Sequence, residues 1–211
     1  MDTKTLFHKV WERHLLESEC NGEWGLVRTE SLTEDAAALN RQRPPSPGRF
    51  GVTTKALGWQ GAFGALSLRV NSEQAERGER EGMLVLRKPD VMAVHIMGSL
   101  KQRDQERAIE EINRLAFADL EDPQHTVIEY VGPGVAEMDM QTRMRLCQHA
   151  VDCGAAAAIM APDDKTFDFL KPQTQDHRDR TWDLCIKSWR GLFADMFAIY
   201  DREAYLNACR I

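Results

Sequence analysis

The spacing of apolar and polar residues along the chain predicts alternating helices and strands. Residues 3–18 place apolar side chains at the spacing of one helix face, which predicts a first helix. A second helix is predicted over residues 31–42, where Glu34 and Asp35 would lie favourably in the first turn. Three prolines within residues 43–48 exclude a helix there and favour an extended connector. This stretch is the best candidate for a boundary within the chain.

The rest of the chain continues the alternation. We predict helices over residues 101–118, 140–153 and 181–191, a helical turn over 165–170, and a solvated helix end and loop over 71–82. We predict strands over residues 83–86, 91–97, 126–131, 155–160 and 196–200. In the second of these strands, His95 shares a face with Val91 and Ala93, which favours a partly buried, hydrogen-bonded structural histidine. The alternation predicts a layered α/β architecture.

The composition and net charge of the chain argue against several classes of protein. The chain has 211 residues, of which 43% are hydrophobic and 28% charged, so we expect a single globular domain over residues 1–211, with residues 43–50 as the candidate internal boundary. A net charge of −6 argues against a nucleic-acid partner. The apolar runs are too short for a membrane span, and the N-terminus lacks the apolar stretch of a secretion signal. Five scattered cysteines do not suggest a disulfide framework, so we expect a cytoplasmic protein.

Common chemical motifs are missing from the sequence. It contains no dinucleotide-binding or phosphate-binding glycine loop, no HExxH or CxxC metal motif, and no Gly-x-Ser-x-Gly elbow. Cys147 and Cys153 lie six residues apart without other ligand types at metal-site spacing, so we interpret them as small core residues. We therefore expect no metal site.

Four segments, in this order along the chain, resemble one protein family. They are residues 4–16 (KTLFHKVWERHLL), 61–66 (GAFGAL), 127–171 (VIEYVGPGV to FDFLK) and the stretch that contains Trp182, Ala194-Asp195 and Tyr200-Asp201. Together they resemble the large subunit of 3-isopropylmalate dehydratase, within the aconitase superfamily, and residues 127–171 are the most specific match. The resemblance implies an aconitase-type α/β/α layered domain, here truncated to roughly half of the family's length.

The sequence departs from the family pattern at the residues that would bind the cofactor and catalyse the reaction. The resemblance implies an iron–sulfur cluster on three cysteines in the second half of the family's large subunit, and none of the five cysteines here stands at such a position. We therefore expect no iron–sulfur cluster and no other cofactor. Thr54, Lys55 and Ala56 stand roughly where the family carries acid–base side chains, and the Asn and Glu of its active-site helix correspond to Gln148 and Asp152. We do not expect the chain to catalyse isopropylmalate isomerisation alone.

The first hypothesis is a repurposed, cluster-free enzyme of the lyase or isomerase type. It would act on a small carboxylic acid in a specialised biosynthetic pathway. Lys55 would pair with a carboxylate or act as a base, and Asp152 is the second candidate catalytic residue. The candidate substrate-binding residues are Thr54, Trp59, Gln60, Gly61 and Gln148. The amides of residues 61–64 would hold an anion if they open a helix. Each of three residues also has a structural interpretation. Lys55 would be a solvated lysine in a loop, Asp152 would be hydrogen-bonded locally at the end of its helix, and Trp59 would only pack against its neighbours.

The second hypothesis is a non-catalytic subunit or interaction module derived from the dehydratase large subunit. It would form a homodimer or bind a small-subunit-like partner protein. The candidate interface residues are Trp182, Trp189, Leu192 and Phe193, with packing in the core as the favoured competing interpretation for each. RNA binding is a weaker third alternative, because the net charge has the wrong sign.

Overall fold

The structure is a computed structural model that describes residues 3–31, 46–54, 58–99, 105–171 and 180–210. The predicted helix over 31–42 and the candidate catalytic residue Lys55 lie outside the described residues. The helices are α1 (Leu6–His14), α3 (Ser72–Glu81), α4 (Gln105–Phe117), α5 (Pro133–Glu137), α6 (Met140–Asp152), α7 (Asp164–Leu170) and α8 (Arg180–Trp189). The described residues also form the 3₁₀ helices η1 (Gly58–Phe63), η3 (Pro123–His125) and η5 (Ala208–Arg210). The strands are β1 (Leu15–Ser18), β2 (Trp24–Arg28), β3 (Glu30–Ser31), β4 (Phe50–Thr53), β5 (Leu66–Arg69), β6 (Met83–Arg87), β7 (Asp90–Met97), β8 (Thr126–Val131), β9 (Ala157–Met160) and β10 (Arg202–Asn207).

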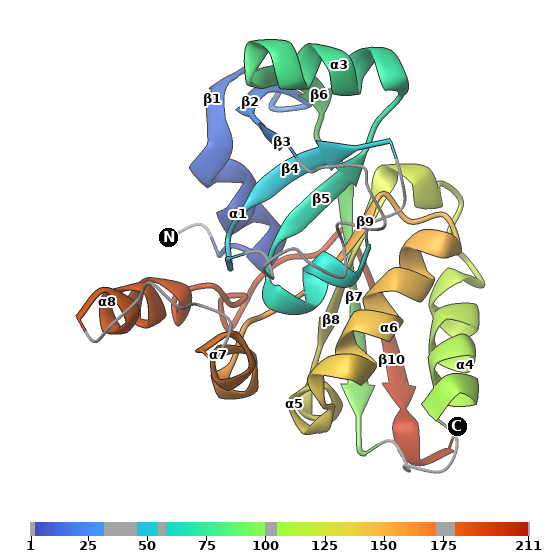
Figure 1. Cartoon of the computed structure of the whole chain (residues 1–211). Coiled ribbons are helices and arrows are strands. Elements are labelled where there is room, and N and C mark those ends of the chain that lie inside the picture. Colours follow the sequence, from blue (N-terminus) through green and yellow to red (C-terminus); the bar gives the residue numbers. More distant parts are fainter. Residues whose placement is uncertain (1–2, 32–45, 55–57, 100–104, 172–179, 211) are drawn as a thin grey trace.

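A parallel sheet in the order β10-β7-β8-β9 forms the centre of the fold (Figure 1). One face carries Met92, Val94 and Ile96 of β7, which belong to the same buried cluster as Ile112 of α4 and Leu146 of α6. The opposite face carries Val91, Val127 and Ile159, which are buried in one cluster with Leu6 and Phe7 of α1. Because both faces of the buried strands are covered, the layered α/β architecture predicted from the sequence is confirmed.

Two smaller sheets lie beside the central one. Strands β3, β4 and β5 pair in parallel, whereas β1, β2 and β6 pair antiparallel. The described part of the 43–50 stretch is tied into this region, because Gly48 N donates to Gly64 O and Leu66 N donates to Arg49 O. The single domain over residues 1–211 and its candidate boundary near 43–50 stay a prediction.

Several elements match their predicted positions, and two do not. Strands β6, β7 and β8 and helices α4 and α6 lie where the pattern places them. The predicted helix over 3–18 instead ends at His14, and Leu15–Ser18 form β1, because this segment pairs with β2. The predicted strand over 196–200 is wrong. The strand that joins the sheet is β10, whose start is fixed to β7 by hydrogen bonds between Asp201 and Val91.

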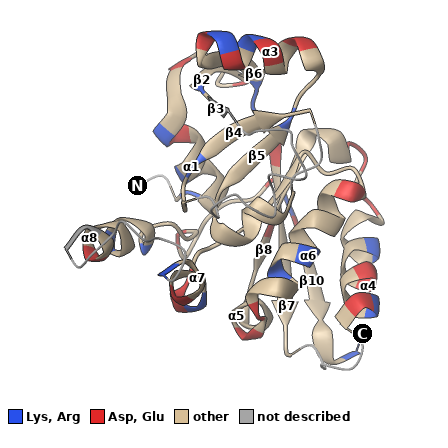
Figure 2. Cartoon of the chain, viewed as in Figure 1, with Lys and Arg blue, Asp and Glu red and all other residues tan. Residues whose placement is uncertain are grey.

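Helix α3 is more regular than the polar sequence suggested. Asn71 caps it, since its side chain accepts from Gln74 N while the Gln74 side chain accepts from Asn71 N. The helix is covered with charged residues of both signs and lies at the outside of the molecule (Figure 2). Among the helices of the described residues, none combines the length and apolar character that crossing a membrane requires.

Candidate functional site

One side of α6 carries a polar stripe that includes both helical residues proposed from the sequence. Arg145, Gln148, His149 and Asp152 follow the i, i+3, i+4, i+7 spacing that places side chains on one helix face. Together with residues of α4, they line a shallow hollow of about 330 Å³. Arg145 forms an ion pair with Glu106 of α4 across this hollow. The sequence analysis missed Arg145 and His149, although the helical spacing from Gln148 and Asp152 could have identified them.

The 3₁₀ helix η1 is held tightly against α6 and β9. A Cβ atom on Gly58 would lie 2.4 Å from the carbonyl oxygen of Cys147, and one on Gly61 would lie 1.7 Å from that of Ala158. Only glycine allows so close a contact with backbone atoms. The packing brings Trp59 N to 3.3 Å from Gln148 Oε1, to which it donates a hydrogen bond. The backbone of η1 therefore fixes the position of the Gln148 side chain.

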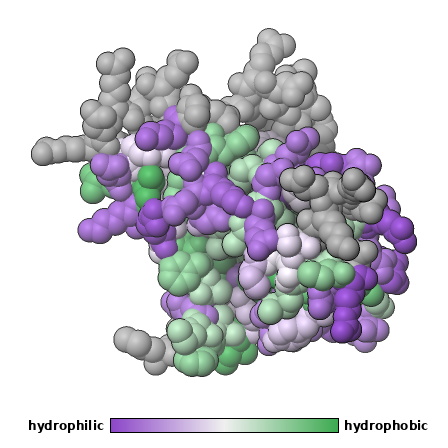
Figure 3. All heavy atoms as spheres, turned by 90° about the horizontal axis from the view of Figure 1, so that it is seen from below, coloured by the Kyte–Doolittle hydropathy of each residue, from purple (hydrophilic) through white to green (hydrophobic). Residues whose placement is uncertain are grey.

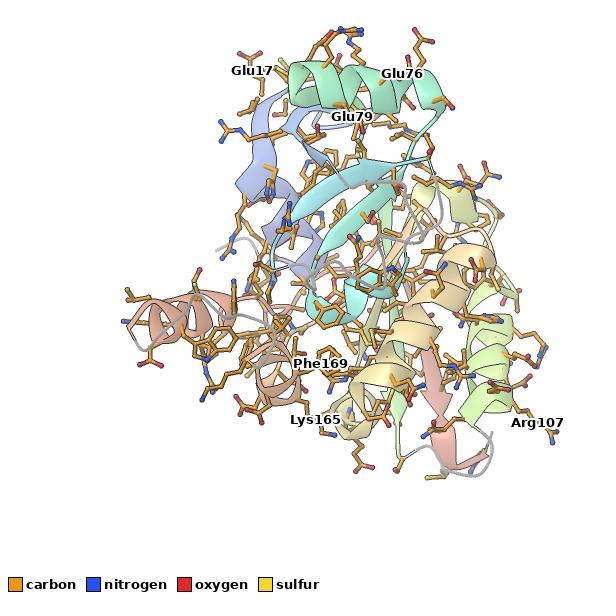
Figure 4. All side chains as sticks on the ribbon, viewed as in Figure 1. Glu17, Glu76, Glu79, Arg107, Lys165 and Phe169 are labelled. Atoms are coloured by element: carbon orange, nitrogen blue, oxygen red, sulfur yellow. The ribbon has the colours of Figure 1, made fainter. Side chains whose placement is uncertain are left out.

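Three of the proposed site residues thus come together. Gln148 Nε2 donates to Asp152 Oδ1 over 2.9 Å, while Gln148 Oε1 accepts from Trp59. The ring of Trp59 packs edge-on against Phe63, which in turn contacts Phe169 of α7 at 5.7 Å between ring centroids (Figure 4). The contacts of the Trp59 side chain among the described residues are packing contacts, whereas its backbone amide positions a polar side chain.

The other proposed residues are placed differently. Thr54 directly follows β4 and is half-buried, and Gln60 and Gly61 are buried within η1. Residues 61–64 do not open a helix, because η1 ends at Phe63 and Gly64 N donates to Gly61 O, so the condition for anion binding by their amides is not met. The amide of Gly64 therefore closes the last turn of η1, just before strand β5.

A buried ion pair lies close to this region and joins α6 to α7. Arg143 is fully buried, and its two terminal nitrogens donate to the two carboxylate oxygens of Asp163 over 2.8 and 2.6 Å. Partial burial of Asp163 works against its charged form, but the hydrogen bonds and charge of Arg143 outweigh it and lower the pKa of the carboxyl. Asp163 also caps α7 by accepting from Thr166 N. The pair fixes the loop that follows β9.

The cysteines do not form a ligand set for the cluster that the resemblance implies. Cys147 is fully buried on α6, and burial raises the pKa of its thiol far above the usual range. Cys153 is exposed, so its interpretation as a core residue is wrong, and its Sγ lies 3.4 Å from His149 Nδ1. Cys20, Cys185 and Cys209 lie on other segments. Within the described ranges, no group of three His, Cys, Asp or Glu side chains is arranged to hold a metal ion. These residues do not fit an iron–sulfur cluster, which needs thiolates grouped in space.

A second, larger hollow lies on the opposite face of the central sheet. It has a volume of about 600 Å³ and is lined by His95, Glu129, Tyr200, Glu203 and Tyr205, among others. The expectation for His95 is confirmed, since it is partly buried and its Nε2 lies 2.7 Å from Glu203 Oε2. The sequence analysis missed Glu129, although a carboxylate inside the otherwise apolar strand TVIEYV was a visible signal.

Comparison with known proteins assigns the chain to a family. Residues 58–211 match the model of the Aconitase family (aconitate hydratase). The 3-isopropylmalate dehydratase large subunit of Anaeromyxobacter dehalogenans is 34% identical over 155 residues, which are 72% of this chain and 31% of that protein. The protein of the same name from Mycobacteroides abscessus is 32% identical over 152 residues, or 70% of this chain and 31% of its own length. The chain thus spans about a third of these relatives, and it belongs to the aconitase family.

Proposed function

We propose that this chain is a divergent, cluster-free, cytoplasmic member of the dehydratase branch of the family that binds a small carboxylic acid on the polar stripe of α6. The relatives are named for a dehydratase of 3-isopropylmalate, which is itself a small carboxylic acid. The observation that carries the proposal is that Arg145, Gln148 and Asp152 line one hollow in which the amide of Trp59 positions Gln148. A reaction of the lyase or isomerase type is proposed for this site.

Each side chain of the stripe has a role that its chemistry supports. The Arg145 guanidinium pairs with Glu106. Arg145 is partly buried, but the Glu106 side chain is 77% exposed, so exchanging Glu106 for a ligand carboxylate costs little. Gln148 and Asp152 offer an amide and a carboxylate that can hydrogen-bond to the hydroxyl of a hydroxy acid. Lys55 and Asp152 stay the proposed acid–base residues, with Thr54, Gln60 and Gly61 as proposed neighbours of the substrate.

The proposal is tested by titrating the protein with malate and with 3-isopropylmalate in a calorimeter. We expect Arg145→Gln to weaken binding by about tenfold or more, because a charge-assisted hydrogen bond contributes about 1.5–3 kcal/mol. Arg114→Gln is the matched control, since Arg114 is an exposed arginine of α4 paired with Glu111. Equal weakening in both variants, or no binding of either acid to the unaltered protein, would contradict the proposal.

A specific observation favours a second candidate, a subunit that needs a protein partner. The segment after α8 exposes four large apolar side chains, with exposed fractions of 53% for Phe193, 89% for Met196, 74% for Phe197 and 77% for Ile199. Apolar side chains are also visible on the face of the molecule that Figure 3 shows. Because the relatives are named large subunits, the proposed partner is a small-subunit-like protein or a second copy of this chain.

A further inference from the structure

The larger hollow is built on two rows of side chains that cross the central sheet. In the first row, Ala93 of β7 pairs with Glu203 of β10 on one side and with Glu129 of β8 on the other. In the second row, His95 pairs with Tyr205 on one side. Residues paired in this way point to the same face of a sheet. Ala93, which lies between the two carboxylates, is itself fully buried, whereas Glu203 and Glu129 both line the hollow. The backbones of these two residues lie about 10 Å apart, two strand spacings.

The first carboxylate, Glu203, is held in position by its neighbours. Tyr205 donates its hydroxyl to Glu203 Oε2 over 2.8 Å, and His95 Nε2 lies 2.7 Å from the same oxygen. The rings of His95 and Tyr205 stack with their centroids 4.2 Å apart. Hydrogen bonds from Tyr205 and His95 lower the pKa of Glu203. Glu203 is therefore ionised at neutral pH, and no donor within the described residues reaches its other oxygen, Oε1.

The second carboxylate, Glu129, is almost completely buried. It accepts hydrogen bonds from the amides of Leu6 and Phe7 at the start of α1 and from the hydroxyl of Tyr200. Burial raises its pKa despite these donors. A carboxylate has about four acceptor positions. One more donor can therefore be accommodated, and a cationic donor would stabilise the ionised form.

Each of the other acidic side chains that line the hollow already forms an ion pair with a basic side chain. Asp163 is paired with Arg143, and Asp195 is paired with Lys9 at 2.6 Å. The described residues that line the hollow include no lysine or arginine. Glu203 thus presents negative charge, and Glu129 presents acceptor oxygens, beside the aromatic rings of Tyr200 and Tyr205. A ligand that complements these groups must supply hydrogen-bond donors and positive charge.

We propose that this hollow is a binding site for a small molecule that carries a protonated amine. The ammonium group would lie between Glu203 and Glu129, where it donates to both carboxylates and contacts the tyrosine rings through cation–π interactions. A volume of about 600 Å³ falls within the range of small-molecule sites, and the hollow lies towards the carboxyl ends of β7 and β8, where open parallel sheets bind ligands. This site is separate from the proposed carboxylate site, which lies across the sheet on α6.

The test compares three probes of similar shape, namely benzylamine, benzyl alcohol and benzoate, by NMR titration of the full chain. We expect benzylamine to bind about tenfold more tightly than benzyl alcohol, and benzoate to bind most weakly, because only the amine pairs with the carboxylates. In Glu203→Gln, which keeps the size of the side chain, this preference should fall to below about threefold. Glu111→Gln on α4, behind the opposite face of the sheet, is the matched control and should keep the preference.

Several outcomes would overturn the inference. These are equal binding of benzylamine and benzyl alcohol, tighter binding of benzoate, absence of amine binding, or a preference that survives in Glu203→Gln. The thermal stability of Glu203→Gln is measured alongside, and Tyr205→Phe provides a second variant that removes only the donor to Glu203 Oε2 and should weaken the preference. Arg145→Gln should leave amine binding unchanged, so this inference and the proposed carboxylate site fail independently.

Discussion

Arg143 is a charged residue that is fully buried and must be balanced by a partner. Its guanidinium lies on the inner side of α6 with no exposed surface, and its Nε finds no hydrogen-bond partner among the described residues. Removing an arginine from water costs several kcal/mol unless its charge is paired. Asp163 supplies the balancing charge and at the same time begins α7. One aspartate therefore joins two helices and fixes the loop between β9 and α7.

We expect Asp163→Asn to lower the free energy of unfolding by about 2–3 kcal/mol at neutral pH, a value reduced for the partial exposure of Asp163. Asparagine is an equally good N-cap, so the loss of unfolding free energy measures the contribution of the Asp163 charge. The pKa of Asp163 is lowered in the folded state. The native protein should therefore be more stable than the variant at pH values above the unfolded pKa of about 3.9, and this difference in unfolding free energy should be lost as the pH falls through the folded pKa. Urea unfolding at several pH values measures this difference. A difference that grows on acidification would contradict the role of the pair.

Among the elements, η1 connects the parts of the proposed carboxylate site. It crosses α6 and β9 at backbone contact distance and donates the Trp59 amide to Gln148. Helix α7 supports it from the side of Phe169, and Lys165 of α7 donates to the carbonyl oxygens of Ala136 and Glu137 at the end of α5 (Figure 4). The geometry of the site therefore depends on backbone packing as much as on polar side chains.

Replacing Gly61 by alanine should lower the free energy of unfolding by at least about 3 kcal/mol, because the new methyl group would overlap the carbonyl of Ala158 and η1 would have to move. The same shift should weaken binding of malate, since the Trp59 amide would no longer align with Gln148. Chemical denaturation and calorimetry measure both effects. Gly191→Ala is the control, because its Cβ would meet its nearest atom at 3.4 Å, an ordinary contact. Similar losses in the two variants would contradict the packing argument.

At the scale of the whole molecule, the segment after α8 exposes a set of large apolar side chains. This segment connects α8 to β10, and Lys9 of α1 donates to Asp195 and to the carbonyl oxygen of Phe193. These contacts with Lys9 hold the segment in place although it does not pair as a strand. Its apolar side chains point away from the core, which a monomer in water does not favour.

We expect the chain to self-associate through this segment, so that light scattering gives a mass above the 24.0 kDa of the single chain. The double variant Met196→Ser/Phe197→Ser should be monomeric. At dilutions where the native chain is also monomeric, the two unfolding free energies should agree within about 0.5 kcal/mol, because both side chains are exposed in the single chain. Val85→Ser, an exposed apolar residue on β6, should keep the association. A native chain that is monomeric at every concentration would contradict this prediction.

The sequence by itself determined the elements whose side-chain pattern repeats locally. Strands β7 and β8 and helices α4 and α6 were predictable because burial on one or both faces leaves a clear periodicity, and the dehydratase-like segments identified the family. The Gln148–Asp152 pair was also predictable, since four residues span one helical turn.

Only the tertiary structure decided the contacts between distant segments. Leu15–Ser18 became a strand because β2 lies beside it, and the strand predicted over 196–200 gave way to β10 because the pairing with β7 starts at Asp201. The larger hollow depends on pairs such as His95 with Glu203, which lie 108 residues apart. A local pattern records whether a residue is buried, but not which residue it meets, because strand pairing and helix packing are settled by the whole chain at once.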